Sequence, residues 1–185
     1  QRQMCIRDSL YNGVASDRIN RQFRFCPRSD GMFNIGSLSY HIGEEDRHHG
    51  YYAVGYALGS SPSETSADKT FNYALWTLIE QPLLHIGESH LGAMWQGGTS
   101  PASRSTCRHY WGAGLIWSNI PPRMTQVGLV VNRALYADGR ETDVELTGSF
   151  PVCNHFTLQP AVHCINTNGN YTAAAQLRAI LEFGN

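Results

Sequence analysis

The sequence predicts an all-β fold: an antiparallel transmembrane β-barrel, present here as an incomplete barrel of about nine strands. Three successive segments near the C-terminus, 141–150, 156–163 and 175–183, alternate between apolar and polar residues. A period of two indicates strands, and about ten residues is the length of a tilted strand that crosses a bilayer. Strands of soluble proteins are usually shorter, about 5–6 residues. The lengths therefore favour a membrane barrel over a soluble sandwich.

The turns between these segments predict how the strands pair. The last turn pairs Gln159 with Arg178, and the turn before it pairs Gln159 with Thr147 and Phe156 with Phe150. Both registers keep apolar residues opposite apolar ones, and a slip of one residue would reverse the faces. Since proline has no N–H, we expect an interrupted ladder beside Pro160 in the middle of its strand.

Six further strands are expected upstream, separated by polar or Gly- and Ser-rich loops. Segment 70–81 also has the spacing of a helix, because its apolar residues include Ala74, Leu75, Leu78 and Ile79. We favour a strand there because of a family resemblance given below. The predicted strands are 32–41, 51–58, 70–81, 90–96, 111–118 and 127–136.

Aromatic residues are expected to border the apolar face of the sheet. Trp111 and Trp117 lie on one side of their strand, about 20 Å apart at about 3.3 Å per residue. This approximates the separation of the aromatic girdles that flank the apolar band of a membrane barrel. Phe150, Phe156 and Phe183 are predicted to close the same band at one level.

Composition excludes several classes of protein. Charged residues make up 16% of the 185 residues and the formal net charge is -1, so the charge balance gives no electrostatic case for binding nucleic acid. No run approaches the roughly 18 apolar residues of a transmembrane helix. The five cysteines have no CxxC or Cys/His zinc spacing. A Cys26–Cys107 bridge and free thiols are both compatible with the sequence, and we expect free thiols.

The beginning of the chain does not continue the strand pattern. Residues 1–9, QRQMCIRDS, resemble translated sequencing-adaptor read-through, so we leave them out of the fold prediction. Residues 10–31 are polar and are expected to form an irregular loop. The barrel portion is therefore predicted to span 32–185.

Several motifs in this portion resemble those of carbohydrate-selective outer-membrane porins, the OprB-like family. The closing hairpins of that family are similar to GRETDVELTGSFPVCNHFTLQPAVHCINTNGN. Upstream, the family's strands are similar to MFNIGSLSYH, GYYAVGYALGS, ALWTLIEQPLL and HYWGAGLIWSNIPPR. The resemblance runs from about Met32 to Phe183, and the five motifs occur in the same order. It implies that this chain is the C-terminal part of a larger closed barrel.

The resemblance implies an outer-membrane protein that lets sugars diffuse down their gradient, without catalysis, cofactor or metal. Its partners would be sugars and outer-membrane lipid, and no oligomeric state is inferred. The C-terminus would be periplasmic, which places the loops near 59–69, 97–107, 137–140 and 166–171 outside. Because an incomplete barrel leaves two edges unpaired, this chain is expected to form an open, curved sheet.

Alternation selects the polar residues of the last three strands as the wall of the pore. Thr147, Gln159 and Arg178 are predicted at about one height, with Glu145 and Gln176 one step away. Mixed polar rows suit a neutral sugar because conduction requires weak contacts. The predicted pore-lining residues are Asp143, Glu145, Thr147, Thr157, Gln159, His163, Gln176, Arg178 and Glu182.

Two other classes of protein remain as alternatives. A soluble β-sandwich that binds glycans would bury Trp111, Trp117 and Leu177 in a core. An enzyme would need titratable groups that converge in a cleft, and the sequence has no GxSxG, HExxH, P-loop or GxGxxG motif. The porin expects Leu146, Leu158 and Leu177 to remain free of a second protein layer.

Overall fold

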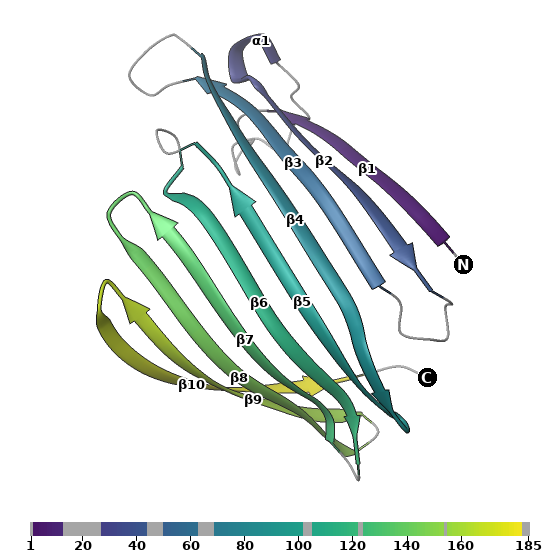
Figure 1. Cartoon of the computed structure of the whole chain (residues 1–185). Coiled ribbons are helices and arrows are strands. Elements are labelled where there is room, and N and C mark those ends of the chain that lie inside the picture. The colour runs from purple at the N-terminus through teal and green to yellow at the C-terminus, as the bar shows by residue number, and fades with distance from the viewer. Residues whose placement is uncertain are drawn as a thin grey trace.

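The chain forms one antiparallel sheet of ten strands (Figure 1). The computed structural model describes residues 2–12, 27–43, 50–62, 69–101, 105–121, 124–153 and 155–182. Each strand pairs with its neighbours in sequence, so the spatial order is the chain order. The strands are β1 (Arg2–Asn12), β2 (Met32–Ile42), β3 (Gly50–Pro62), β4 (Lys69–Ile86), β5 (Ser89–Thr99), β6 (Cys107–Ile120), β7 (Met124–Tyr136), β8 (Arg140–Cys153), β9 (Phe156–Thr167) and β10 (Asn170–Leu181).

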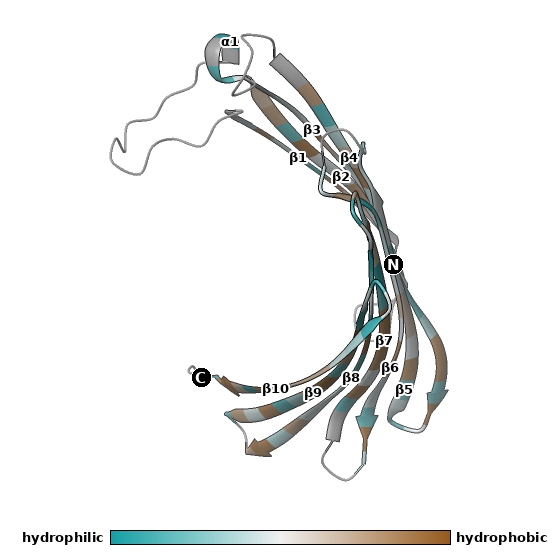
Figure 2. Cartoon of the chain, turned by 90° about the vertical axis from the view of Figure 1, so that its left-hand side faces the viewer, coloured by the Kyte–Doolittle hydropathy of each residue, from teal (hydrophilic) through white to brown (hydrophobic). Residues whose placement is uncertain are grey.

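The sheet is open and strongly curved. Strands β1 and β10 are its two edges, and Figure 2 shows the ten strands following an arc. The predicted all-β antiparallel fold and the predicted open sheet are therefore confirmed, whereas the sheet does not close into a barrel. Among the described residues no helix is long and apolar enough to cross a membrane.

The up-and-down topology creates two rims. The upper rim in Figure 1 carries the connections β1–β2, β3–β4, β5–β6, β7–β8 and β9–β10. The lower rim carries the other four connections and both ends of the chain. The described strand ends that flank the predicted loops near 59–69, 97–107, 137–140 and 166–171 all lie at the upper rim.

The structure contains a strand within the residues that the fold prediction left out. Residues 2–12 form β1, which pairs with β2 from Arg2↔Ile42 to Asn12↔Met32, so the strands number ten rather than about nine. The alternation of Met4, Ile6 and Leu10 is present in the sequence but is broken at Asp8. Residues 10–12 therefore belong to β1.

Part of the predicted irregular region also contains regular structure. Within 10–31, residues Pro27–Asp30 form the short helix α1. Cys26 lies outside the described residues. Cys107 is a free thiol, as expected, so it takes no part in a bridge.

Segment 70–81 is a strand, as predicted over the helical alternative. It belongs to β4, which pairs with β3 on one side and β5 on the other. Strand β4 runs further than expected, to Ile86, and passes Pro82 with a register shift between Pro82 and Leu84. Such irregularities accommodate a residue that cannot donate to the ladder. Only Gly87 and Glu88 remain for the turn, and Gly87 has a positive φ of 62°.

The predicted register of the last hairpin is confirmed, because Arg178 pairs with Gln159. A tight turn at Asn168 and Gly169 closes this hairpin, and their φ values of 54° and 96° are those that an Asn-Gly hairpin turn accepts.

The predicted register of the preceding hairpin was wrong by two residues. Thr147 lies opposite Ala161 and Phe150 opposite Leu158. Strand β8 extends to Cys153, which shortens the turn, and the register shifts between Pro151 and Cys153. A two-residue change preserves both faces because side chains alternate with a period of two.

The expected interruption beside Pro160 is observed. The β8–β9 ladder records no pair between Thr147↔Ala161 and Phe150↔Leu158. In this interval the hydroxyl of Thr147 donates to the carbonyl oxygen of Pro160 at 3.2 Å. A side-chain donor therefore contacts the backbone where the ladder is incomplete.

The sheet is a single layer with almost no hydrophobic core. Among the described residues, the buried apolar side chains are Ala53 and Ala161, which are 2% and 7% exposed. Local contacts between strands are therefore the main packing available. One of them is between β3 and β4, where the indole of Trp76 covers Gly55.

We predict that Gly55→Ala destabilises the sheet. A Cβ at Gly55 would overlap the rigid indole of Trp76, whereas a Cβ at Gly92 would meet its nearest atom, the carbonyl oxygen of Gln81, at 3.6 Å. Overpacking of this kind costs about 1–3 kcal/mol. Urea unfolding should show that loss for Gly55→Ala and a change within about 0.5 kcal/mol for the control Gly92→Ala. Equal effects would contradict the Trp76 contact.

Candidate functional site on the concave face of the sheet

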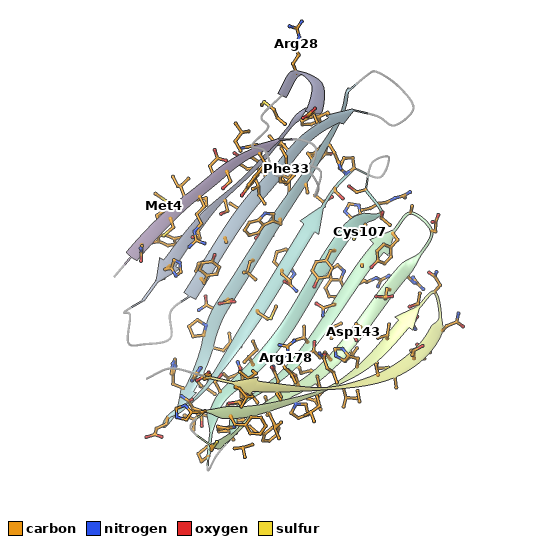
Figure 3. The ribbon with its side chains drawn as sticks, turned by 180° about the vertical axis from the view of Figure 1, so that it is seen from behind. Met4, Arg28, Phe33, Cys107, Asp143 and Arg178 are labelled. Atoms are coloured by element: carbon orange, nitrogen blue, oxygen red, sulfur yellow. The ribbon has the colours of Figure 1, made fainter. Side chains whose placement is uncertain are left out.

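The registers divide the side chains of the sheet into two faces. The face that carries Asp143 is called the concave face here, because Asp143 is seen when the sheet is viewed into its hollow side (Figure 3). One row across this face shows how the ladders align residues from different strands. The row consists of Gln96, Gly112, Asn132, Asp143, Ile165 and Thr172.

The opposite, convex face is apolar and exposed. Its central side chains are between 41% and 68% exposed, although most of them are leucine or valine. No second layer of described residues covers them. These residues are Leu38, Val54, Leu75, Leu115, Leu129, Leu146, Val162 and Leu177.

The convex face also carries polar side chains, among them Arg133 and two hydrogen-bonded pairs. Near β1, the side-chain amide of Asn34 donates to Asp8 at 2.8 Å. Between β3 and β4, the hydroxyl of Tyr52 donates to the side-chain oxygen of Gln81. In both pairs the two polar groups are partners on the same face, which lowers the cost of placing them in apolar surroundings.

Eight of the nine residues predicted to line a pore share the concave face. Three come from β8, three from β9 and two from β10, and they are Asp143, Glu145, Thr147, Thr157, Gln159, His163, Gln176 and Arg178. Glu182 follows the end of β10, where its backbone N–H donates to the carbonyl oxygen of His155 at 3.0 Å. The alternation therefore predicted the grouping of these residues, and their pore-lining role remains a prediction.

The predicted heights of these residues need one correction. Gln159 and Arg178 are direct partners, as predicted. Thr147 instead faces Ala161, which pairs with Gln176, so Thr147 lies one step away from the Gln159–Arg178 row. The cause is the two-residue error in the β8–β9 register.

The predicted girdle residues lie on the convex face wherever they are described. Trp111, Trp117 and Phe150 are 38%, 46% and 40% exposed, and Phe156 is half-buried. Phe156 pairs with Leu181, but Phe150 lies opposite Leu158, so Phe150 and Phe156 are not at one level as predicted. Phe183 lies outside the described residues.

Further aromatic residues extend the two bands on this face. Tyr73 and Tyr171 lie toward the upper rim, like Trp111. Tyr40 and Tyr52 are direct partners toward the lower rim, like Trp117. The alternation of odd and even positions along each strand already placed these tyrosines on one face. They were not identified as part of a band because the residues beside them on the neighbouring strands were unknown.

Sequence reasoning missed a hydrogen-bonded network on the concave face of β5, β6 and β7. The amide of Gln96 donates to the hydroxyl of Tyr110 at 2.6 Å, and this hydroxyl donates to the side-chain oxygen of Asn132 at 2.8 Å. Gly112 leaves the space that the network needs, because a Cβ there would overlap the amide of Asn132. These residues offer donors and acceptors without a net charge.

A charged cluster lies beside this network on β8 and β9. The ring nitrogen Nδ1 of His163 is 3.1 Å from the carboxylate oxygen Oδ2 of Asp143, and Glu145 is the direct cross-strand partner of His163. One ligand atom from each of the three residues can be chosen so that all lie within 4.8 Å of one another. Of the described residues, this trio has the composition and proximity of metal ligands. Local sequence spacing does not reveal it because two strands supply the residues.

The comparisons with known proteins give no match. No family model, curated protein or solved structure matches the chain.

We predict that Tyr110→Phe weakens the sheet. The substitution removes the hydroxyl that links Gln96 to Asn132 and leaves two amide groups without that partner. The loss of unfolding free energy should be about 1–3 kcal/mol. The matched control is Tyr171→Phe, since Tyr171 is 75% exposed. Urea unfolding of both variants measures the difference, and similar midpoints would show that the network contributes nothing.

Proposed function

We propose that the chain is the C-terminal portion of an OprB-like outer-membrane porin, and that it forms part of the wall of a pore through which sugars diffuse passively. The observation that carries this proposal is the single-layer sheet with one exposed apolar face and one face on which polar side chains gather. Alternation of this kind is what a membrane barrel requires, because its strands contact lipid on one side and a wet lumen on the other.

The exposed apolar face gives an energetic argument for lipid. Burying a leucine, valine or phenylalanine side chain fully is worth about 1.5–3 kcal/mol. The eight central side chains of the convex face, each about half exposed, therefore leave on the order of 10 kcal/mol unrealised in water. This is comparable to the net stability of a whole domain, about 5–15 kcal/mol. Hydrocarbon against the convex face would remove this cost.

The burial of three side chains favours the porin over a soluble glycan-binding sandwich. The sandwich expects Trp111, Trp117 and Leu177 in a core, and they are 38%, 46% and 68% exposed. The porin also expects Leu146 to lack a second protein layer, and Leu146 is 53% exposed. Leu158, which carries the same expectation, is half-buried within the single sheet.

The polar groups on the concave face suit a neutral, hydroxyl-rich solute. Gln96, Tyr110 and Asn132 supply hydrogen-bonding groups, and Gln159 lies beside the positive charge of Arg178. Mixed donors and acceptors permit contacts that are weak enough for release, which conduction requires. Under this proposal the lower rim faces the periplasm and the upper rim faces the outside.

We predict that a charge on the convex face opposes membrane folding. Leu146→Lys should cost about 2–4 kcal/mol if its side chain lies near the bilayer centre. Thr147→Lys is the matched control, because Thr147 is the next residue of the same strand and lies on the opposite face. Urea titration of both variants in phosphatidylcholine vesicles measures the two costs. A Thr147→Lys cost as large as that of Leu146→Lys would count against a lipid-facing convex surface.

We predict that Arg178→Ala changes permeation in the complete porin. Removing this positive charge from the pore wall should raise the permeability to cations relative to anions and alter sugar flux. The control is Arg133→Ala, because Arg133 pairs with Trp111 on the other face. Single-channel recordings and liposome flux assays provide the measurements. Unchanged selectivity and flux for every sugar tested would remove Arg178 from the pore wall.

A further inference from the structure

The cluster of Asp143, Glu145 and His163 combines three metal-ligating side chains on one rigid surface. Asp143 and Glu145 are two residues apart on β8, so they share the concave face, and His163 is the direct partner of Glu145 on β9. The strand pairing therefore fixes three Cβ atoms at the corners of a triangle. All three residues are partly buried, so their side chains are accessible to an ion but partly withdrawn from water.

The two carboxylates of the cluster have too few hydrogen-bonding or charged partners. The oxygen Oδ1 of Asp143 is buried and has no hydrogen-bond partner, while Oδ2 contacts His163 at 3.1 Å. No side-chain hydrogen bond or ion pair joins the carboxylate of Glu145 to another of the described residues. A buried, unpartnered carboxylate oxygen is costly, and a cation would remove that cost.

We propose that Asp143, Glu145 and His163 form a binding site for a divalent transition-metal ion, with zinc as the ion that fits best. Zinc accepts carboxylate oxygen and imidazole nitrogen, and sites with three protein ligands commonly complete their coordination with water. The neutral imidazole and the two carboxylates would give a complex without net charge.

The observed distances are close to those of a coordinated ion. In a tetrahedral site with bonds of about 2.0–2.1 Å, neighbouring ligand atoms lie about 3.3 Å apart. The His163–Asp143 contact of 3.1 Å already meets this spacing, and the largest separation among the chosen ligand atoms is 4.8 Å. The ligand atoms would therefore need to approach one another by up to about 1.5 Å for all three to contact one ion.

The histidine separates this site from a calcium or magnesium site. Both of those ions prefer oxygen ligands, whereas imidazole suits zinc, copper, iron and nickel. Zinc binding should therefore persist when calcium and magnesium are present in excess. The proposal does not depend on the porin function, because it concerns the binding of the ion and not the passage of a solute.

The test is a calorimetric titration with Zn²⁺ of the folded protein in a buffer with excess Ca²⁺ and Mg²⁺. The thiols are first alkylated, because free cysteines such as Cys153 and Cys164 could bind zinc themselves. We expect one tight Zn²⁺ site per chain. His163→Gln and Asp143→Asn should each weaken Zn²⁺ binding at least about tenfold, since even the loss of a residue that only supports a ligand costs about 10–100-fold.

His155→Gln is the matched control, because it removes an exposed histidine from the turn before β9 and leaves the cluster intact. Its Zn²⁺ affinity should equal that of the unaltered chain. Asp143→Asn preserves the shape of its side chain, and circular dichroism before each titration verifies the β-sheet of every variant. Absence of a tight site, or equal affinities for the unaltered chain and the Asp143→Asn/His163→Gln double variant, would overturn the proposal and leave Asp143 and His163 as a hydrogen-bonded pair only.

Discussion

The rest of the structure depends on the register of the antiparallel backbone ladders. Only Ala53 and Ala161 are buried apolar side chains among the described residues, so no packed core fixes the positions of the strands. Their alignment comes from backbone hydrogen bonds and from the side chains that meet across each pair of strands. Because a shift of one residue would exchange the faces, the ladders also determine which residues face the hollow of the sheet.

The strands and faces of the C-terminal third could be predicted from the sequence because their alternation is regular. The pairing of Gln159 with Arg178 followed from the position of an Asn-Gly turn. The β8–β9 register could not be derived in the same way, since the length of the turn after Phe150 depends on an irregularity at Pro151 and Cys153. Strand β1 was missed because residues 1–9 were left out of the fold prediction on their resemblance to adaptor read-through.

The candidate site was predictable only in part. Parity identified which polar residues of β8, β9 and β10 share a face, but not which of them are in contact. The predicted register placed His163 opposite Asp143, whereas His163 lies opposite Glu145 and reaches Asp143 diagonally. Proximity between residues of different strands depends on register, and an error of two residues moves a partner by about 7 Å. The Gln96–Tyr110–Asn132 network was not predicted for the same reason, because its residues come from three strands.

Strand number has a consequence for the two ends of the chain. Because ten is even and every strand reverses direction, Arg2 and Leu181 both lie at the lower rim. A reporter attached to either terminus would therefore sample the same compartment if the sheet were set into a membrane. Because this follows from the connectivity alone, one impermeant reagent should reach both termini. The result does not depend on which lipid or solute the two faces contact.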